Sequence, residues 1–384
     1  MGTIERADGP FLPSGTLSFD IFCRVIDNFG DIGVCWRLAR QLAATQEHYP
    51  VRLWVDDLRS FVKIEPAVDP ALNSQTAQGV EIVHWTGDVP ALLPYKVVIE
   101  AFACNPPAAF IDRMQEQESI WINLEYLSAE AWVESCHALP SVQPNGLHKS
   151  FFFPGFSNAT GGLLRETALL RDRDAWLSQP HLRWQLLQQL GMPPELIQGL
   201  QTGWQQVFLF CYPSAPVHAL AQALAEHPLP SVTIVPSGVY PGLKGLATGH
   251  VHVFETPFVE QARFDQLLWC SDLNFVRGED SLVRALWAGK PLIWQIYEQE
   301  DETHLIKLQA WLAQSPYDQL IHELMIAWNT GDGTSFGHLL QNALTRPNFS
   351  RWQTDACAWA EKLSENSDLA ASLIKFCAKN QRTG

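Results

Sequence analysis

The chain has 384 residues, of which 47% are hydrophobic and 17% charged, and its formal net charge is −15 at pH 7. This composition is typical of a folded globular protein and excludes a disordered chain. The length is sufficient for two domains that each bury a core. The negative charge opposes binding to nucleic acid or to an anionic membrane, so we expect neither as a partner.

The cysteines and histidines indicate no metal centre. The eight cysteines are scattered and form no CxxC pair, which favours free thiols in a reducing compartment over disulfides or a zinc site. The twelve histidines show no zinc-ligand spacing. Neither a signal peptide nor a membrane-spanning stretch is visible. We therefore expect a cytoplasmic protein without a bound metal.

The first half of the chain alternates apolar strands with helical segments, a pattern typical of a parallel, doubly wound sheet. The first helix is expected over residues 34–45. Strands are expected over residues 19–26, 51–55, 80–84, 96–101 and 119–124.

A turn with two glycines and two aspartates joins the first strand to the first helix. Asp27 and Asp31 are spaced so that both carboxylates can project over the carboxyl end of the sheet, where open α/β sheets bind ligands. Gly30 and Gly33 permit positive φ and the close approach of a bulky group. The turn lacks the GxGxxG pattern of a dinucleotide site. The structural alternative is that Asp27 forms an Asx turn and Asp31 caps the helix.

The middle of the chain connects this series to a second one. The aromatic run at residues 151–156 (FFFPGF) fits a lid or docking surface, or else a loop packed between domains. Residues 172–205 are expected to be helical and to connect the domains. Further strands are expected over residues 207–212, 232–236, 251–254, 273–276 and 291–297.

These elements predict an α/β protein with two Rossmann-like domains that face each other across a cleft. The first domain is expected over residues 1–180 and the second over 181–359. A C-terminal helix within residues 360–384 is expected to pack back on the first domain. We expect the protein to be a monomer.

The segment Arg277-Gly278-Glu279-Asp280-Ser281 joins a strand to a helix in the second half. If Asp280 or Ser281 caps the helix, the first-turn N–H groups point into the cleft and can bind a diphosphate. Arg277 adds charge-assisted hydrogen bonds to such a group. Glu279 is unfavourable beside a diphosphate and is better suited to accept hydrogen bonds from sugar hydroxyls. The alternative is a plain capped helix with a surface ion pair.

A set of aromatic residues and one amide precedes this segment. Phe258, Gln261 and Phe264 are spaced by three residues near a strand end, so two rings and an amide can sandwich and read a nucleobase. Phe210 and Tyr212 alternate on the first strand of the second half and can face the same pocket. Taken singly, an aromatic residue at any of these positions is more often part of the core than of a ligand site.

The chain resembles the EarP family of bacterial rhamnosyltransferases, which modify an arginine of translation elongation factor P. The resemblance covers nearly the whole chain and rests on the runs FDIFCRVIDNFGDIGVCWRLARQLA, RLWVDDL, INLEYLSAE, FFFPGF, TGGLLRE and RGEDSLVRALWAGKPLIWQIY. One departure is Phe29, where tyrosine is expected in many relatives; the ring is kept but the hydroxyl is absent.

The resemblance implies a GT-B glycosyltransferase fold, a dTDP-β-L-rhamnose donor, elongation factor P as the acceptor and inversion at the anomeric carbon. Its catalytic residues correspond to Asp27, Asp31 and Glu279. Its donor-binding residues correspond to Phe210, Tyr212, Phe258, Gln261, Phe264, Arg277, Asp280 and Ser281.

The chemistry of arginine agrees with this assignment. A guanidinium has a pKa above ~12 and is a poor nucleophile while protonated, so an enzyme must orient it and remove a proton. We expect Asp31 to act as the base, Asp27 to orient the guanidinium and Glu279 to lie on the donor side. Arg277 and helix N–H groups can stabilise the leaving diphosphate, so no metal or other cofactor is expected. The alternatives are a non-catalytic binding protein for a sugar nucleotide or translation factor, and a sugar-nucleotide epimerase.

Overall fold

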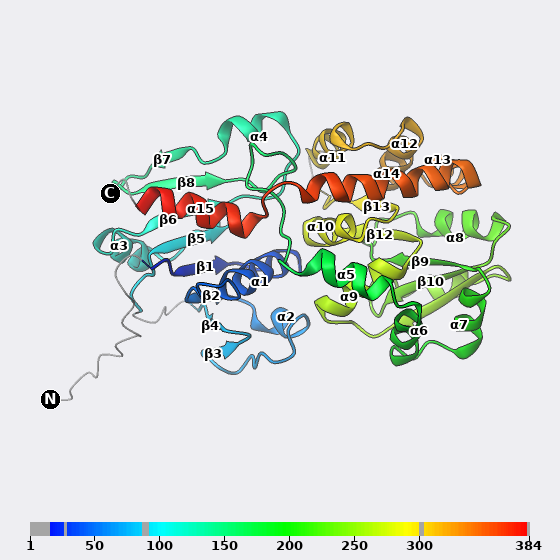
Figure 1. The fold of residues 1–384 in the computed structure, drawn as a ribbon, viewed down its shortest axis with the longest axis horizontal. Coiled ribbons are helices and arrows are strands. Elements are labelled where there is room, and N and C mark those ends of the chain that lie inside the picture. Colours follow the sequence, from blue (N-terminus) through cyan, green and yellow to red (C-terminus); the bar gives the residue numbers. More distant parts are fainter. Residues whose placement is uncertain (1–15, 27–28, 87–91, 299–302, 382–384) are drawn as a thin grey trace.

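The structure, a computed structural model, describes residues 16–26, 29–86, 92–298 and 303–381. Two α/β halves lie side by side along the long axis of the molecule (Figure 1). Each half has one sheet whose central strands are apolar and almost completely buried. Parallel strands covered by helices on their faces produce such continuous apolar runs.

The N-terminal half contains one sheet, which comprises eight strands among the described residues in the order β3-β4-β2-β1-β5-β6-β8-β7. Its pairs are parallel except for the two edge pairs, β3 with β4 and β7 with β8. The strands are β1 (Phe19–Cys23), β2 (Val51–Val55), β3 (Ser74–Ala77), β4 (Val80–His84), β5 (Val97–Ala101), β6 (Ile120–Leu124), β7 (Pro140–Val142) and β8 (His148–Phe152). The helices within this half are α1 (Gly30–Ala43), α2 (Leu58–Val62), α3 (Ala108–Glu116) and α4 (Ala131–Cys136).

The C-terminal half contains a sheet of five parallel strands in the order β11-β10-β9-β12-β13. They are β9 (Gln205–Leu209), β10 (Ser231–Pro236), β11 (Val251–Thr256), β12 (Leu273–Arg277) and β13 (Leu292–Gln295). The helices from the connector onward are α5 (Leu169–Leu177), α6 (Pro180–Gln189), α7 (Pro194–Gln201), α8 (Val217–Glu226), η1 (Leu243–Leu246), α9 (Gln261–Cys270), α10 (Gly278–Ala288), α11 (Thr303–Gln314), α12 (Gln319–Thr330), α13 (Gly333–Ala343), α14 (Arg346–Ser364) and α15 (Leu369–Gln381).

The chain passes between the halves twice, and the two crossings are bonded to each other. The first crossing lies before α5, since α5 already packs on the C-terminal half: its Trp176 packs edge-on against Trp269 of α9. The sequence-based boundary at residue 180 instead assigned α5 to the first domain. The second crossing separates α14, on the C-terminal half, from α15, on the N-terminal half (Figure 1). Leu369 N–H donates to the Leu163 carbonyl at 3.0 Å, joining the two crossings.

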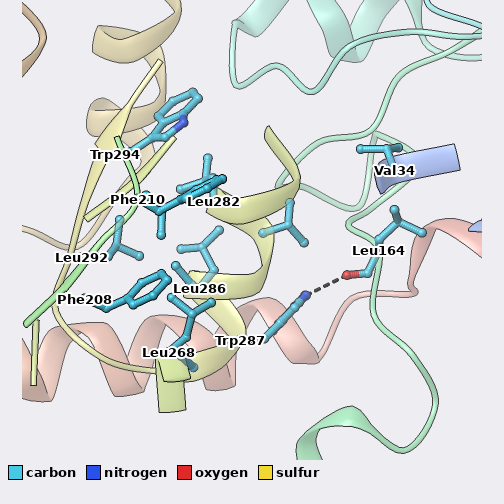
Figure 2. Packing of buried hydrophobic residues seen from close by; sticks show 14 of the residues in the cluster. Val34, Leu164, Phe208, Phe210, Leu268, Leu282, Leu286, Trp287, Leu292 and Trp294 are labelled. Atoms are coloured by element: carbon cyan, nitrogen blue, oxygen red, sulfur yellow. Dashed lines mark hydrogen bonds between the residues drawn. The ribbon is translucent and has the colours of Figure 1, made fainter. Parts of the chain in front are cut away.

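The buried core continues from the C-terminal sheet through α10 to the first crossing (Figure 2). Leu282 and Leu286 of α10 lie towards the sheet, where Phe208 and Leu292 surround them. On the far side of the helix, the indole N–H of Trp287 donates to the Leu164 carbonyl at 2.7 Å. Helix α10 is therefore fixed between its own sheet and the connector.

The aromatic run at residues 151–156 is part of the core. Phe152 is 1% exposed and packs against Phe376 of α15, and Phe156 stacks on Trp359 of α14. The alternative of a lid or docking surface is therefore wrong. These rings are covered by the two C-terminal helices, which lie far away in the sequence. None of the helices described is both long and apolar enough to cross a membrane.

The order of the strands determines where ligands can bind. In the N-terminal sheet the chain runs outward from β1 through β2 and then returns to the other side of β1 as β5. In the C-terminal sheet it runs outward from β9 through β10 and then returns to the other side of β9 as β12. Crevices at such switch points, outside the carboxyl ends of the strands, are the usual ligand sites of open α/β sheets. Both switch points open towards the boundary between the halves.

Candidate active site

Two adjoining pockets lie at this boundary. The first, which we call the aromatic pocket, contains all eight side chains predicted to bind a donor; they are Phe210, Tyr212, Phe258, Gln261, Phe264, Arg277, Asp280 and Ser281. The second, which we call the carboxylate pocket, contains Asp31 and has a volume of about 260 Å³. Glu279 lines both pockets, so the structure brings two of the predicted carboxylates, Asp31 and Glu279, together with the predicted donor residues.

Arg277 ends β12 and points towards the aromatic rings that follow β9. Its guanidinium carbon lies 4.4 Å from the centre of the Phe210 ring and 4.8 Å from that of Tyr212. One N–H of the guanidinium donates to the Cys211 carbonyl at 2.8 Å. Cation–π contacts and this hydrogen bond orient the group. The remaining guanidinium donors can still serve an anionic ligand.

The start of α10 differs from the predicted cap. Arg277 occupies the N-cap position, and no side chain caps the helix, so the expectation that Asp280 or Ser281 does so is wrong. Gly278 begins the helix with a φ of 64°, a left-handed conformation that favours glycine. The first-turn N–H groups, which have no acceptor within the helix, line the aromatic pocket and are suited to an anion.

Asp280 has a different role from the one expected. Its Oδ1 accepts a hydrogen bond from Arg37 of α1 at 2.8 Å, and its Oδ2 accepts one from Arg284 at 2.8 Å. Burial raises its pKa, but the two arginines outweigh that effect and leave the pKa below its usual range. Both carboxylate oxygens thus accept hydrogen bonds from arginines, and the side chain links α10 to α1 instead of binding a donor directly.

Gln261 and Phe264 lie on α9, which begins at Gln261. The Gln261 carbonyl oxygen accepts a hydrogen bond from Arg40 of α1 at 2.7 Å. Because the oxygen is held by the N-terminal half, the amide NH₂ is the part available to a ligand. The Phe264 ring packs edge-on against Phe210 at 5.4 Å.

Asp31 lies in the first turn of α1, and its side chain turns back towards β1. Its Oδ2 accepts a hydrogen bond from the Ile26 N–H at 2.8 Å, and its Oδ1 lies 3.5 Å from the Tyr126 hydroxyl. Phe29 is the N-cap residue of α1, and no side chain caps this helix. The alternative that Asp31 is a helix cap is therefore wrong. Asp27 lies outside the described residues.

Glu279 connects the two halves at the pocket. Although it belongs to α10, its Oε2 accepts a hydrogen bond from the backbone N–H of Leu127, which follows β6, at 2.8 Å. Because Glu279 also lines both pockets, it is suited to contact a group that lies between them.

Gly33 brings α1 and α10 together. It lies inside α1, and a Cβ at this position would lie 3.2 Å from Asp280 Oδ2 of α10. The close approach expected of this glycine is confirmed. The bulky neighbour is a carboxylate of the other half.

The carboxylate pocket also contains aromatic and basic residues that the sequence analysis missed. Phe102 and Tyr126 stack with ring centres 4.3 Å apart, and the Lys307 amino group lies 5.8 Å from the Tyr126 ring. Phe102 has a φ of 57°, and Ala103 has a φ of 53°. Positive φ at two successive residues other than glycine is costly, and such strain clusters at ligand sites. Tyr297, His304 and Lys307 complete the far wall.

No group of three His, Cys, Asp or Glu side chains in the described part of the chain is arranged to hold a metal ion. The charged side chains that line the two pockets are instead three carboxylates and a set of basic groups, namely Asp31, Glu279, Asp280, Arg277, Arg284, His304 and Lys307.

The fold, with two Rossmann-like domains and a shared cleft between them, is that of the GT-B class of glycosyltransferases. A glycosyltransferase from Rickettsia africae has the same fold, with a TM-score of 0.52 at 9% identity, and the match covers 94% of this chain and 96% of that one. The predicted fold class is therefore confirmed.

The chain belongs to the EarP family, because the model of the family described as Elongation-Factor P (EF-P) rhamnosyltransferase EarP matches residues 19–378. It is 44% identical to the protein-arginine rhamnosyltransferase of Pseudomonas aeruginosa, over 94% of this chain and 99% of that protein. It is 33% identical to the protein of the same name from Neisseria meningitidis, over 94% and 97% of the two chains.

A solved structure gives the same result. The structure described as the basis for EarP-mediated arginine glycosylation of translation elongation factor EF-P is 31% identical to this chain, with a TM-score of 0.63. The match covers 94% of this chain and 98% of that one. The protein is therefore an enzyme of the protein-arginine rhamnosyltransferase family, and the resemblance seen in the sequence is confirmed.

Proposed function

We propose that this enzyme transfers L-rhamnose from dTDP-β-L-rhamnose to an arginine side chain of translation elongation factor P, with inversion at the anomeric carbon. The observation that carries the proposal is the position of Glu279 between the aromatic pocket and the carboxylate pocket. Membership of the EarP family supports the choice of sugar and acceptor. Because the acceptor is a translation factor, the proposed site of action is the cytoplasm.

The donor nucleotide is assigned to the aromatic pocket. The thymine base stacks on Phe258 and Phe264, and the Gln261 amide donates a hydrogen bond to a base carbonyl. The diphosphate binds at the N-terminus of α10, beside Arg277 and Ser281. This arrangement directs the rhamnosyl group towards Glu279, which accepts hydrogen bonds from its hydroxyl groups.

The acceptor arginine is assigned to the carboxylate pocket. Asp31 acts as the base that removes a proton from the guanidinium as the nitrogen attacks the anomeric carbon. The Tyr126 ring, which stacks on Phe102 and already has the Lys307 amino group 5.8 Å from its centre, is proposed to stack on the planar guanidinium of the acceptor. Asp27 is proposed to orient the guanidinium through paired hydrogen bonds.

The proposed displacement occurs in a single step. The nitrogen–carbon bond forms as the bond from the anomeric carbon to the diphosphate breaks, and the electron pair of that bond stays with the diphosphate. Arg277 and the first-turn N–H groups of α10 stabilise the developing charge. Because the base lies on the N-terminal half and the leaving group on the C-terminal half, attack occurs opposite the leaving group, which gives inversion. The proposed mechanism needs no metal ion.

The experiment is incubation of the protein with dTDP-β-L-rhamnose and purified elongation factor P, followed by mass spectrometry of the acceptor. Addition of one deoxyhexose, located on an arginine by fragmentation, is the expected result, and nuclear magnetic resonance of the product determines the anomeric configuration. An unchanged acceptor with altered free sugar nucleotide would instead indicate an epimerase. Tight binding without turnover would indicate a binding protein.

A further inference from the structure

Arg37 of α1 lies at the centre of a buried charge network between the halves. Its side chain is completely buried. Its Nε and Nη2 donate to the two carboxylate oxygens of Glu166, in the first crossing, at 2.8 Å each. Its Nη1 donates to Asp280 Oδ1, in α10, also at 2.8 Å. One guanidinium thus joins the N-terminal half, the connector and the C-terminal half.

The network continues into the C-terminal half. The Nε of Arg284 donates to the other oxygen of Asp280. Its Nη1 lies 2.9 Å from both carboxylate oxygens of Asp265 in α9 and donates to them. Burial opposes the charge on Arg37, but Glu166 and Asp280 outweigh it and raise its pKa. Arg37 is therefore held in its charged form, and removal of one of its carboxylate partners leaves a buried charge that is only partly compensated.

The network connects directly to the proposed catalytic groups. Asp280 follows Glu279 in the first turn of α10, and Arg37 lies on the same helix as Asp31. Two successive residues of α10 are bonded to the N-terminal half, since Glu279 accepts from Leu127 N–H and Asp280 accepts from Arg37. The Arg37–Asp280 contact therefore fixes how far apart Asp31 and Glu279 are.

Only arginine fits this position. A guanidinium can donate to Glu166 with one edge and to Asp280 with its remaining nitrogen, whereas the single ammonium of lysine cannot reproduce this fork. A displacement of about 1 Å between reacting groups can reduce turnover by ~10²-fold. Changes at Arg37 thus alter alignment across the cleft without touching either substrate.

We propose that Arg37 is a positioning residue that acts through Asp280 to hold the first turn of α10, with Glu279, in register with Asp31. This inference rests on the proposed function. It separates alignment from donor binding, because the residues proposed to contact the thymine and the diphosphate all belong to the C-terminal half, whereas Arg37 belongs to the N-terminal half.

The test compares Arg37→Lys with a matched control, Arg52→Lys. Arg52 forms a buried two-pronged pair with Asp20, at 2.6 and 2.9 Å, but both residues lie near the amino ends of strands in the N-terminal sheet. For each variant, kcat, the KM values of both substrates, the Kd of dTDP and the melting temperature are measured. Glu166→Gln, which keeps an oxygen acceptor for Arg37, is a milder second variant in case Arg37→Lys fails to fold.

We expect kcat of Arg37→Lys to fall by ~10–100-fold, with the Kd of dTDP unchanged, and Glu166→Gln to show a smaller loss of the same kind. Arg52→Lys should lower the melting temperature but leave kcat unchanged. Wild-type kcat in Arg37→Lys would overturn the inference, as would an equal loss in Arg52→Lys or a parallel loss of dTDP affinity. If the wild-type protein fails to modify elongation factor P, the proposed function fails instead.

Discussion

The ring of Phe29, at the start of α1, lies 5.0 Å from the ring of Phe258, after β11, with the two planes inclined by 46°. The contact joins the two halves across the mouth of the aromatic pocket, whose volume is about 60 Å³. Pockets for small molecules usually measure ~300–1,000 Å³. A nucleobase that stacks on the face of Phe258 now covered by Phe29 would replace this ring–ring contact.

The first prediction concerns this ring. Phe258→Ala should weaken dTDP binding by about ten- to a hundredfold, because stacking of a base on an aromatic side chain contributes ~1–3 kcal/mol. Isothermal titration calorimetry measures the change. Trp132→Ala, which removes an exposed ring of α4, serves as the control and should bind dTDP normally. Wild-type affinity in Phe258→Ala would remove this residue from the donor site.

The second prediction assigns the base. Asp31→Asn preserves shape while removing the proton acceptor, so kcat should fall by ~10²–10⁴-fold with dTDP affinity retained. Glu279→Gln should impair both turnover and donor binding. Steady-state kinetics with elongation factor P and calorimetry with dTDP separate these effects. If Asp31→Asn is active and Asp27→Asn is inactive, the two roles must be exchanged.

The third prediction concerns the acceptor. Replacement of Tyr126 by leucine removes the proposed stacking surface and should raise the KM for elongation factor P by about two- to thirtyfold, the equivalent of a cation–π contact of ~0.5–2 kcal/mol. Tyr126→Phe keeps the ring and should behave like the wild type. Equal defects in the two variants would show that the hydroxyl group, which lies near Asp31, matters instead.

The fourth prediction concerns stability in acid. Burial raises the pKa of Glu166, but the charge and hydrogen bonds of Arg37 outweigh it and hold that pKa well below its usual range. A depressed carboxyl pKa stabilises the fold above the unfolded value of ~4.3, and the contribution declines as the pH falls towards the folded pKa. Glu166→Gln should therefore melt below the wild type at pH 7, with a smaller difference near pH 3. A constant difference would contradict this interpretation.

Local chemistry made part of the site predictable. In both the turn around Asp31 and the segment from Arg277 to Ser281, an apolar strand is followed within a few residues by glycine and acidic residues. Even there, the ends of the elements differ from those predicted: the first helix was expected to begin at residue 34, whereas α1 begins at Gly30 and includes Gly33. A glycine within a helix can be tolerated where another helix, here α10, must approach closely. The spacing of residues around Gly33 does not reveal that α10 lies there.

Contacts between distant segments could not be predicted in this way. Arg37 and Asp280 are 243 positions apart, and nothing in their local sequence indicates a pair. The position of Phe102 in the pocket could not be predicted either, because its positive φ is imposed by the surrounding fold and is not marked in the sequence by a glycine. Lys307 reaches the pocket from α11, whose helical pattern does not indicate which sheet edge it covers.

The return of α15 to the N-terminal half affects the order in which the protein is completed during synthesis. Phe152 and the Leu163 carbonyl leave the ribosome long before Phe376 and Leu369, the residues that cover and bond them. Domains otherwise tend to fold as they emerge, with the N-terminal one first. Here the half that is translated first is completed after α14 of the other half, so a nascent chain exposes an apolar face of its first domain until α15 is released.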